Sequence, residues 1–187
     1  MVTKERERAV TLGAMLVVLV IALTYTAYTV LKVKQAERAD NPAAHAFSNK
    51  EGQTPYTDLQ GNAVTLDTYV GDVIVANSWA SWSPKSATEL PRLVSIADEF
   101  REEGIVIIAV NRAEPRSTAE RFLRSIGVSG DVKLVLDPDD RYYESIEGYA
   151  MPETLIYDRQ GQVVFHQHGS ISTEVLRANI RRAIEAE

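Results

Sequence analysis

The hydrophobic positions of this chain form two patterns, and the first is a continuous uncharged run near the N-terminus. From Ala9 to Leu31 the sequence is strongly apolar in its first half and carries threonines and tyrosines in its second half. About 20 helical residues cross the hydrocarbon core of a bilayer, and tyrosine is common at the membrane–water boundary. We therefore predict a transmembrane helix over residues 9–31, preceded by a short tail over residues 1–8.

A cleaved signal peptide is the competing interpretation of this run. The nominal cleavage motif Ala-His-Ala at 44–46 lies far beyond it, and charged residues intervene. The run is also longer than the roughly 7–15 apolar residues of a signal peptide. We therefore expect an uncleaved anchor and a single-pass cell membrane protein. Three basic residues flank each end, so charge leaves the orientation open; we expect the globular part on the extracytoplasmic side.

The second pattern follows a polar tether over residues 32–54 and extends from residue 55 to residue 187. Short continuous apolar runs indicate buried strands, and apolar positions at a spacing of 3.6 residues indicate helices packed on a sheet. Strands are predicted over 72–79, 105–110, 132–137, 153–158 and 162–167. Helices are predicted over 84–103, 117–126, 139–147 and 172–187.

Two tight turns decide the kind of sheet. Gly61-Asn62 divides residues 56–66 into two short extended pieces, and Arg159-Gln160-Gly161 joins the last two strands. Tight hairpins are antiparallel, whereas strand–helix–strand units give parallel pairs. The predicted fold class is α/β, with a mixed central sheet flanked by helices and an N-terminal hairpin, formed by residues 55–187.

Helix starts are marked by serine in three places. Ser83 precedes Pro84, which is a favoured combination of N-cap and first helical residue. Ser86 with Glu89, and Ser117 with Glu120, have the spacing of capping boxes. We therefore expect each of these serines to accept a hydrogen bond from a backbone N–H at a helix N-terminus.

Charge and composition restrict the function. The chain has 20 basic and 26 acidic residues. The first 47 residues contain six of the basic and four of the acidic residues, so the rest of the chain has a net charge of −8. An acidic domain lacks the clustered cations that bind phosphates, so no nucleic-acid partner is predicted. The absence of cysteine excludes disulfides, thiol nucleophiles and cysteine-ligated zinc. No cofactor is predicted.

Two motifs carry a family resemblance that covers about residues 50–187. The segment "NSWASWSPKSATELP" (77–91) resembles the N-x-W-A-x-W-C-x-x-C-x-x-E-x-P segment of membrane-anchored thioredoxin-like proteins of the TlpA/ResA type, which are related to cytochrome c maturation thioredoxins. The segment "GYAMPETLIYDRQGQVV" (148–164) resembles the second signature of that family. The resemblance implies a thioredoxin-like fold and a cis peptide bond before Pro152, at the start of a strand.

The departure from the family pattern is at its centre. Ser83 and Ser86 stand where the resemblance implies two cysteines. In such proteins the first thiolate attacks a substrate disulfide and the second resolves the mixed disulfide. A serine hydroxyl forms no disulfide and has no two-electron redox couple. These two positions are therefore degenerate, and no functional catalytic residue is predicted at them.

Ser83 is also a poor candidate for a serine nucleophile, because such a residue needs an adjacent base. The three histidines of the chain are His45, in the tether, and His166 and His168, at the end of the last strand. The resemblance implies that this end does not lie beside the turn. No G-x-S-x-G motif is present.

His166 and His168 are two residues apart on a predicted strand, so they share a face. A metal site needs three or four ligands, and the sequence places no carboxylate or third histidine near them. We therefore predict a solvated strand face and no metal site.

The remaining candidate is a binding surface formed by Trp82, Pro84, Met151 and Pro152, which the resemblance places together as an apolar groove. The same residues could instead persist because they pack the turn. The favoured hypothesis is a redox-silent, anchored domain that binds an extended polypeptide or a partner protein. The alternative is a Cys-to-Ser form of an active TlpA/ResA-type thiol-disulfide oxidoreductase, acting in redox homeostasis or cytochrome c maturation. A purely structural subunit of a membrane complex is a third hypothesis.

Overall fold

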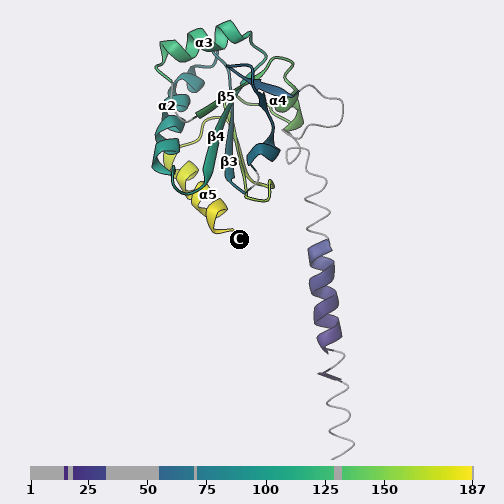
Figure 1. Cartoon of the computed structure of the whole chain (residues 1–187). Coiled ribbons are helices and arrows are strands. Elements are labelled where there is room, and N and C mark those ends of the chain that lie inside the picture. Colours follow the sequence, from purple (N-terminus) through teal and green to yellow (C-terminus); the bar gives the residue numbers. More distant parts are fainter. Residues whose placement is uncertain (1–14, 17–18, 33–54, 70, 129–131, 187) are drawn as a thin grey trace, which may run out of the picture. The chain divides into compact units, whose positions relative to one another are not determined.

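A computed structural model of the chain describes residues 15–16, 19–32, 55–69, 71–128 and 132–186 (Figure 1). The chain divides into two compact units, Met1–Asp40 and Asn41–Glu187. The predicted tail over residues 1–8 lies outside the described residues, as does almost all of the predicted tether.

The described part of the first unit is helical at residues 15–16 and 19–32. Its threonine hydroxyls donate to carbonyls one turn earlier, as between Thr24 and Val20 (2.9 Å). Among the described residues, no helix combines the length and the apolar character needed to cross a bilayer. The predicted transmembrane helix over residues 9–31, of which 9–14 and 17–18 are outside the described ranges, is therefore not supported by the structure.

The second unit is built on a mixed sheet with seven strands among the described residues, in the order β2-β1-β5-β4-β3-β6-β7. Strands β3, β4 and β5 are parallel, and the β1–β2 and β6–β7 hairpins are antiparallel, as the two tight turns predicted. The strands are β1 (Tyr56–Asp58), β2 (Ala63–Val64), β3 (Val73–Trp79), β4 (Ile105–Arg112), β5 (Val132–Asp137), β6 (Glu153–Tyr157) and β7 (Val163–His168).

The central strands are apolar because both of their faces are covered. Figure 1 shows α2 and α5 on one side of the sheet and α4 on the other. Alternate residues of β3 enter separate cores: Val73 and Val75 pack under α2, α3 and α5, whereas Ile74 and Ala76 pack towards α4. The helices are η2 (Leu66–Tyr69), α2 (Pro84–Glu99), α3 (Arg116–Ser125), α4 (Arg141–Ser145) and α5 (Thr173–Glu185).

The expected α/β fold with a mixed sheet is confirmed, but some helix ends are not where the pattern placed them. Helix α2 ends at Glu99 and is followed by a turn up to Gly104, which has a φ of 67°. The capping box at Ser117 is wrong, because α3 begins at Arg116 and has no side-chain cap. Glu120 instead pairs with Arg116, at 2.8 Å between Oε1 and Nε.

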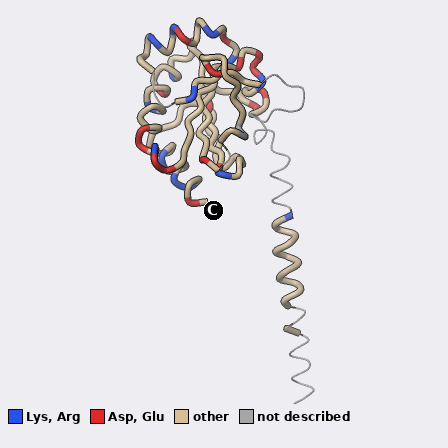
Figure 2. Tube along the Cα trace, viewed as in Figure 1, with Lys and Arg blue, Asp and Glu red and all other residues tan. Residues whose placement is uncertain are grey.

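Acidic and basic residues are interleaved along the helices of the second unit, as Figure 2 shows for α3. Asp137, the last residue of β5, has a buried carboxylate. Its Oδ2 accepts hydrogen bonds from the backbone N–H groups of Tyr142 and Tyr143. Burial raises the pKa of Asp137 to about 6, although these hydrogen bonds oppose the rise.

Candidate functional site

The two serines lie in the turn between β3 and α2 and in the first turn of α2. Ser83 occupies the N-cap position and Pro84 is the first residue of α2, as predicted, but the Ser83 side chain makes no capping hydrogen bond. Both Ser83 and Ser86 are buried. The backbone N–H of Ser86 donates to the carbonyl of Ser83 (3.0 Å), and the Ser86 hydroxyl accepts from the N–H of Ala80 (3.4 Å). The two serines are therefore neighbours inside one tight turn.

A buried carboxylate just after the next strand along the chain supports this turn. Glu114 follows β4, and its two carboxylate oxygens accept hydrogen bonds from the backbone N–H (2.9 Å) and the hydroxyl of Ser81. The side-chain amide of Asn111 also donates to Glu114 (2.7 Å). Sequence reasoning missed Glu114, although parallel strands β3 and β4 end at the same edge of the sheet, so a residue just after β4 was a candidate neighbour of the turn.

A second buried network lies behind the turn. The side-chain amide of Asn77 donates to Glu89 (2.8 Å) and to the hydroxyl of Thr154 (2.9 Å), and the N–H of Ile171 donates to the other oxygen of Glu89 (3.2 Å). Burial raises the pKa of Glu89, and these hydrogen bonds offset part of the rise. The predicted capping box of Ser86 and Glu89 is therefore wrong. Glu89 of α2 instead accepts hydrogen bonds from β3, from β6 and from the segment before α5.

The predicted binding residues lie near this end of the sheet. Trp82 is 62% exposed, in contrast to Trp79, which is buried and stacked on Phe122. The peptide bond between Met151 and Pro152 is cis, as the resemblance implied, and β6 begins at the next residue.

Around the cis peptide bond, Pro152 is buried and Met151 is half-buried, while Pro84 in the turn is exposed. Tyr149, which sequence reasoning did not single out, is 75% exposed. Among the described residues, no backbone–backbone hydrogen bond outside the helices and strands involves Met151. Whether these residues bind anything stays a prediction.

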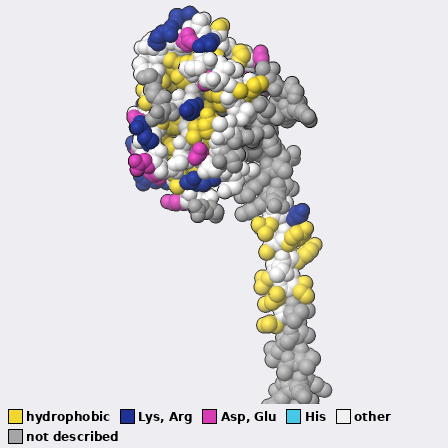
Figure 3. Space-filling view, in the orientation of Figure 1, with side chains coloured by type: hydrophobic (Ala, Val, Ile, Leu, Met, Phe, Trp, Pro, Cys, Tyr) yellow, Lys and Arg dark blue, Asp and Glu magenta, His cyan; other side chains and the backbone are white. Residues whose placement is uncertain are grey.

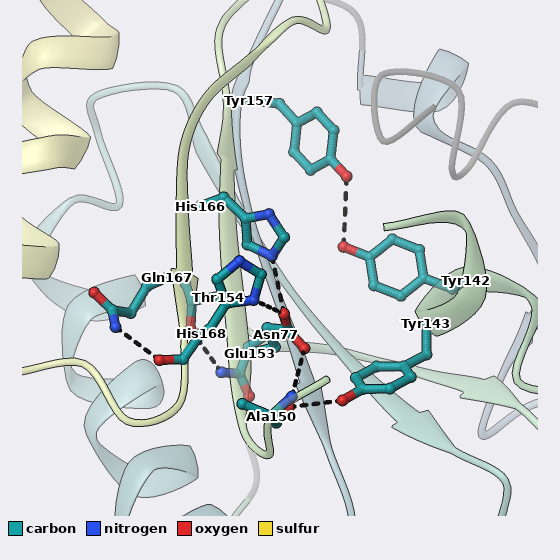
Figure 4. A network of polar contacts seen from close by, with 10 residues as sticks. All are labelled: Asn77, Tyr142, Tyr143, Ala150, Glu153, Thr154, Tyr157, His166, Gln167 and His168. Atoms are coloured by element: carbon teal, nitrogen blue, oxygen red, sulfur yellow. Dashed lines mark hydrogen bonds and ion pairs between the residues drawn. The ribbon is translucent and has the colours of Figure 1, made fainter. Parts of the chain in front are cut away.

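The two histidines are not on a simple solvated face. Glu153 lies directly across from His168 on the neighbouring strand, and both histidines contact its Oε1 atom (Figure 4). The expectation that no carboxylate lies near them is therefore wrong. Burial alone would raise the pKa of Glu153, but the hydrogen bonds from His166, His168 and the backbone N–H of Ala150, together with the electrostatic attraction of His168, lower it.

This arrangement also bears on Ser83 as a nucleophile. The two histidines of the described residues are both engaged by Glu153, and neither forms a hydrogen bond to Ser83. His45 lies outside the described residues. In the described part of the chain, the turn therefore has no histidine base that could activate a hydroxyl.

Comparison with known proteins identifies relatives along most of the chain. Residues 41–166 match the model of the AhpC/TSA family. The thiol-disulfide oxidoreductase ResA of Geobacillus kaustophilus is 27% identical over 177 residues, which are 95% of this chain and 97% of that protein. The thiol:disulfide interchange protein DsbE of Allochromatium vinosum is 32% identical over 142 residues, which are 76% of this chain and 73% of that protein.

Solved structures show the same fold. The thioredoxin domain of a thiol-disulfide oxidoreductase from Bacteroides vulgatus has a TM-score of 0.61 and 20% identity, and the match covers 73% of this chain and 99% of that one. A secreted disulfide oxidoreductase from Mycobacterium tuberculosis has a TM-score of 0.60 and 16% identity, with 70% and 96% covered. The thioredoxin-like fold is thereby confirmed.

The contacts of Glu114 predict a loss of stability when its carboxylate is removed. Glu114→Ala should lower the free energy of unfolding by about 2–3 kcal/mol, because the donors of half-buried Ser81 and buried Asn111 lose a charged acceptor. Glu120→Ala is the matched control, since it removes only exposed ion pairs on α3 and should cost less than about 1 kcal/mol. Urea unfolding measures both, and equal losses would contradict the role given to Glu114.

Proposed function

The chain belongs to the AhpC/TSA family and is a homologue of the ResA and DsbE thiol-disulfide oxidoreductases, and we propose that it is a redox-silent member that holds an extended polypeptide or a partner protein beside the Ser83–Ser86 turn. The observation that carries this proposal is the pair of serines at the two positions that the resemblance assigns to thiols. Dithiol exchange needs a thiolate to attack a disulfide and a second thiol to release the product. Neither step is available to a hydroxyl group.

The surface beside the turn supports binding without chemistry. Trp82 and Tyr149 are large aromatic side chains that remain exposed, so both are available for contact with a partner. Tryptophan and tyrosine are also enriched among residues that dominate binding energy. The backbone of Met151, which makes no backbone–backbone hydrogen bond in the described turns and loops, could pair with an added extended segment, in the manner of β-strand addition.

Membrane attachment is the second part of the proposal. Residues 9–31 contain no charged side chain. Along the described helix at residues 19–32, apolar side chains are exposed, as Figure 3 shows. We propose that residues 9–31 anchor the protein in the cell membrane and that residues 55–187 lie on its extracytoplasmic side.

A second candidate function is the Cys-to-Ser form of an active oxidoreductase. The names of ResA and DsbE describe thiol-disulfide chemistry, and the turn keeps the geometry of a tight helix start. The gene in its native genome separates the two candidates, because cysteine codons at positions 83 and 86 would establish the oxidoreductase.

Removing Trp82 should weaken polypeptide binding. Fluorescence anisotropy of the full-length chain with a labelled, reduced and alkylated polypeptide measures the affinity. We expect Trp82→Ala to weaken it by about 5- to 30-fold, the loss typical of an aromatic residue that dominates an interface. Val175→Ala on α5 removes another exposed apolar side chain and should change little. Binding that is absent, or equal in the two variants, would rule out this surface.

Restoring both thiols should restore redox chemistry. The double variant Ser83→Cys/Ser86→Cys places its first thiol at the N-terminus of α2, where the helix dipole favours a thiolate. We expect measurable insulin-disulfide reduction with dithiothreitol as the electron source. Ser83→Cys alone has no resolving thiol and should form mixed disulfides without turnover. A folded but inert double variant would show that more than the thiols has been lost.

Deleting residues 9–31 should release the protein from membranes. In cells expressing the chain, we expect the full-length protein to stay in the membrane pellet after an alkaline carbonate wash and the deletion variant to appear in the supernatant. Protease added to spheroplasts should digest the full-length domain from outside. Extraction of the full-length chain by carbonate would refute the anchor, and protection from protease would refute the orientation.

A further inference from the structure

Glu153, His166 and His168 converge on one face of the sheet, on the side of α4. Glu153 and His168 face each other directly across the β6–β7 pair, and His166 lies across from Leu155. Residues at alternate positions of a strand share a face, so all three side chains extend from the same side. Figure 4 shows both imidazoles directed at the Glu153 carboxylate.

The register that brings them together depends on a bulge. Near the hairpin turn Tyr157 is opposite Val163, but the next pair is Ile156 with Phe165, so Val164 is an extra residue. Without this shift, His166 would be opposite Thr154 and would share its face. With it, the two histidines lie on the face of Glu153.

The spacing of the three groups suits a small metal ion. The Nε2 atom of His166 lies 3.2 Å from Oε1 of Glu153, and the two imidazole rings have centroids 4.0 Å apart. One ligand atom from each residue lies within 4.8 Å of the other two. Bonds of about 2.0–2.1 Å in a tetrahedral site separate ligand atoms by about 3.3 Å, so only small side-chain adjustments are needed.

Burial and access also fit a bound cation. The Glu153 side chain is fully buried, whereas the His166 and His168 side chains are 24% and 31% exposed. A buried carboxylate needs a positive partner close to it. The partly exposed imidazoles leave a route by which an ion can enter from solvent.

Neighbouring groups hold the three side chains in place. The second oxygen of Glu153 accepts from the backbone N–H of Ala150 (3.4 Å), and the ring of Tyr149 stacks on His168 with centroids 4.1 Å apart. Groups of this kind orient the ligands of metal sites. The carbonyl of Ala150 in turn accepts from the Tyr143 hydroxyl (2.9 Å).

We propose that Glu153, His166 and His168 form a site for a divalent transition-metal ion of the zinc class, with one coordination position left open. Two imidazoles and one carboxylate suit Zn²⁺, Ni²⁺ or Cu²⁺ and do not suit Mg²⁺ or Ca²⁺, which take oxygen ligands. Three protein ligands with an open position are typical of zinc sites that exchange a water or another ligand. The site includes no residue of the Ser83–Ser86 turn, although Tyr149, which stacks on His168, also belongs to the exposed surface proposed for polypeptide binding.

Zinc titration of the full-length chain tests the site directly. The chain is purified without a polyhistidine tag, stripped with EDTA and titrated with ZnCl₂ by calorimetry. We expect one ion per chain and a higher unfolding temperature with zinc than without it, because the ion binds the folded state. His168→Asn, His166→Asn and Glu153→Gln should each weaken binding by more than the ~10–100-fold that loss of an outer-shell partner costs.

His45→Asn is the matched control, since His45 is the remaining histidine of the chain, and it should leave affinity and stoichiometry unchanged. Unfolding of each variant without metal shows that it is folded. If a histidine variant does not fold, the cobalt(II) form of the wild-type chain decides: strong visible bands of a four-coordinate ion support the site. Weak bands of the aqueous ion, no saturable zinc binding, or zinc binding equally strong in Glu153→Gln would overturn it.

Discussion

The antiparallel register between β3 and β6 organises both faces of this domain. It sets Asn77 opposite Thr154 and Ser78 opposite Glu153. Neighbouring residues of a strand point to opposite faces. Asn77 and Thr154 therefore form hydrogen bonds with Glu89 of α2 on one face, whereas Glu153 contacts the two histidines of β7 on the other. A slip of one residue would exchange the two faces and leave buried polar groups without their partners, so the apolar cores and the polar networks specify the same register.

Most of the fold could be predicted because its elements have strong local patterns. The buried strands β3 and β4 are continuous apolar runs, and the hairpin turns contain glycines, Gly61 and Gly161, that adopt positive φ in the structure. Helix ends were less predictable, because a capping pattern competes with tertiary contacts. Glu89 has the spacing of a cap to Ser86, yet a buried carboxylate is stabilised more by the three donors that the fold brings to it.

The site was predictable only where one segment contains it. The turn with Trp82 and the two serines could be located from its own residues. The cis peptide bond before Pro152 could be predicted from the family resemblance. The pairing of Glu153 with His168 could not, because it depends on the single extra residue at Val164 in the β6–β7 hairpin. Counting outward from the turn without the bulge places the histidines on the wrong face.

With serine at positions 83 and 86, the turn has no redox state that could change with its surroundings. A dithiol turn exists in two covalent states, and their ratio follows the reduction potential of the surroundings. A turn with two hydroxyl groups has one covalent state in oxidising and reducing environments alike. Its shape and its exposed aromatic surface are therefore constant, and any complex formed there ends by simple dissociation, at a rate set by its contacts and not by the supply of a reductant.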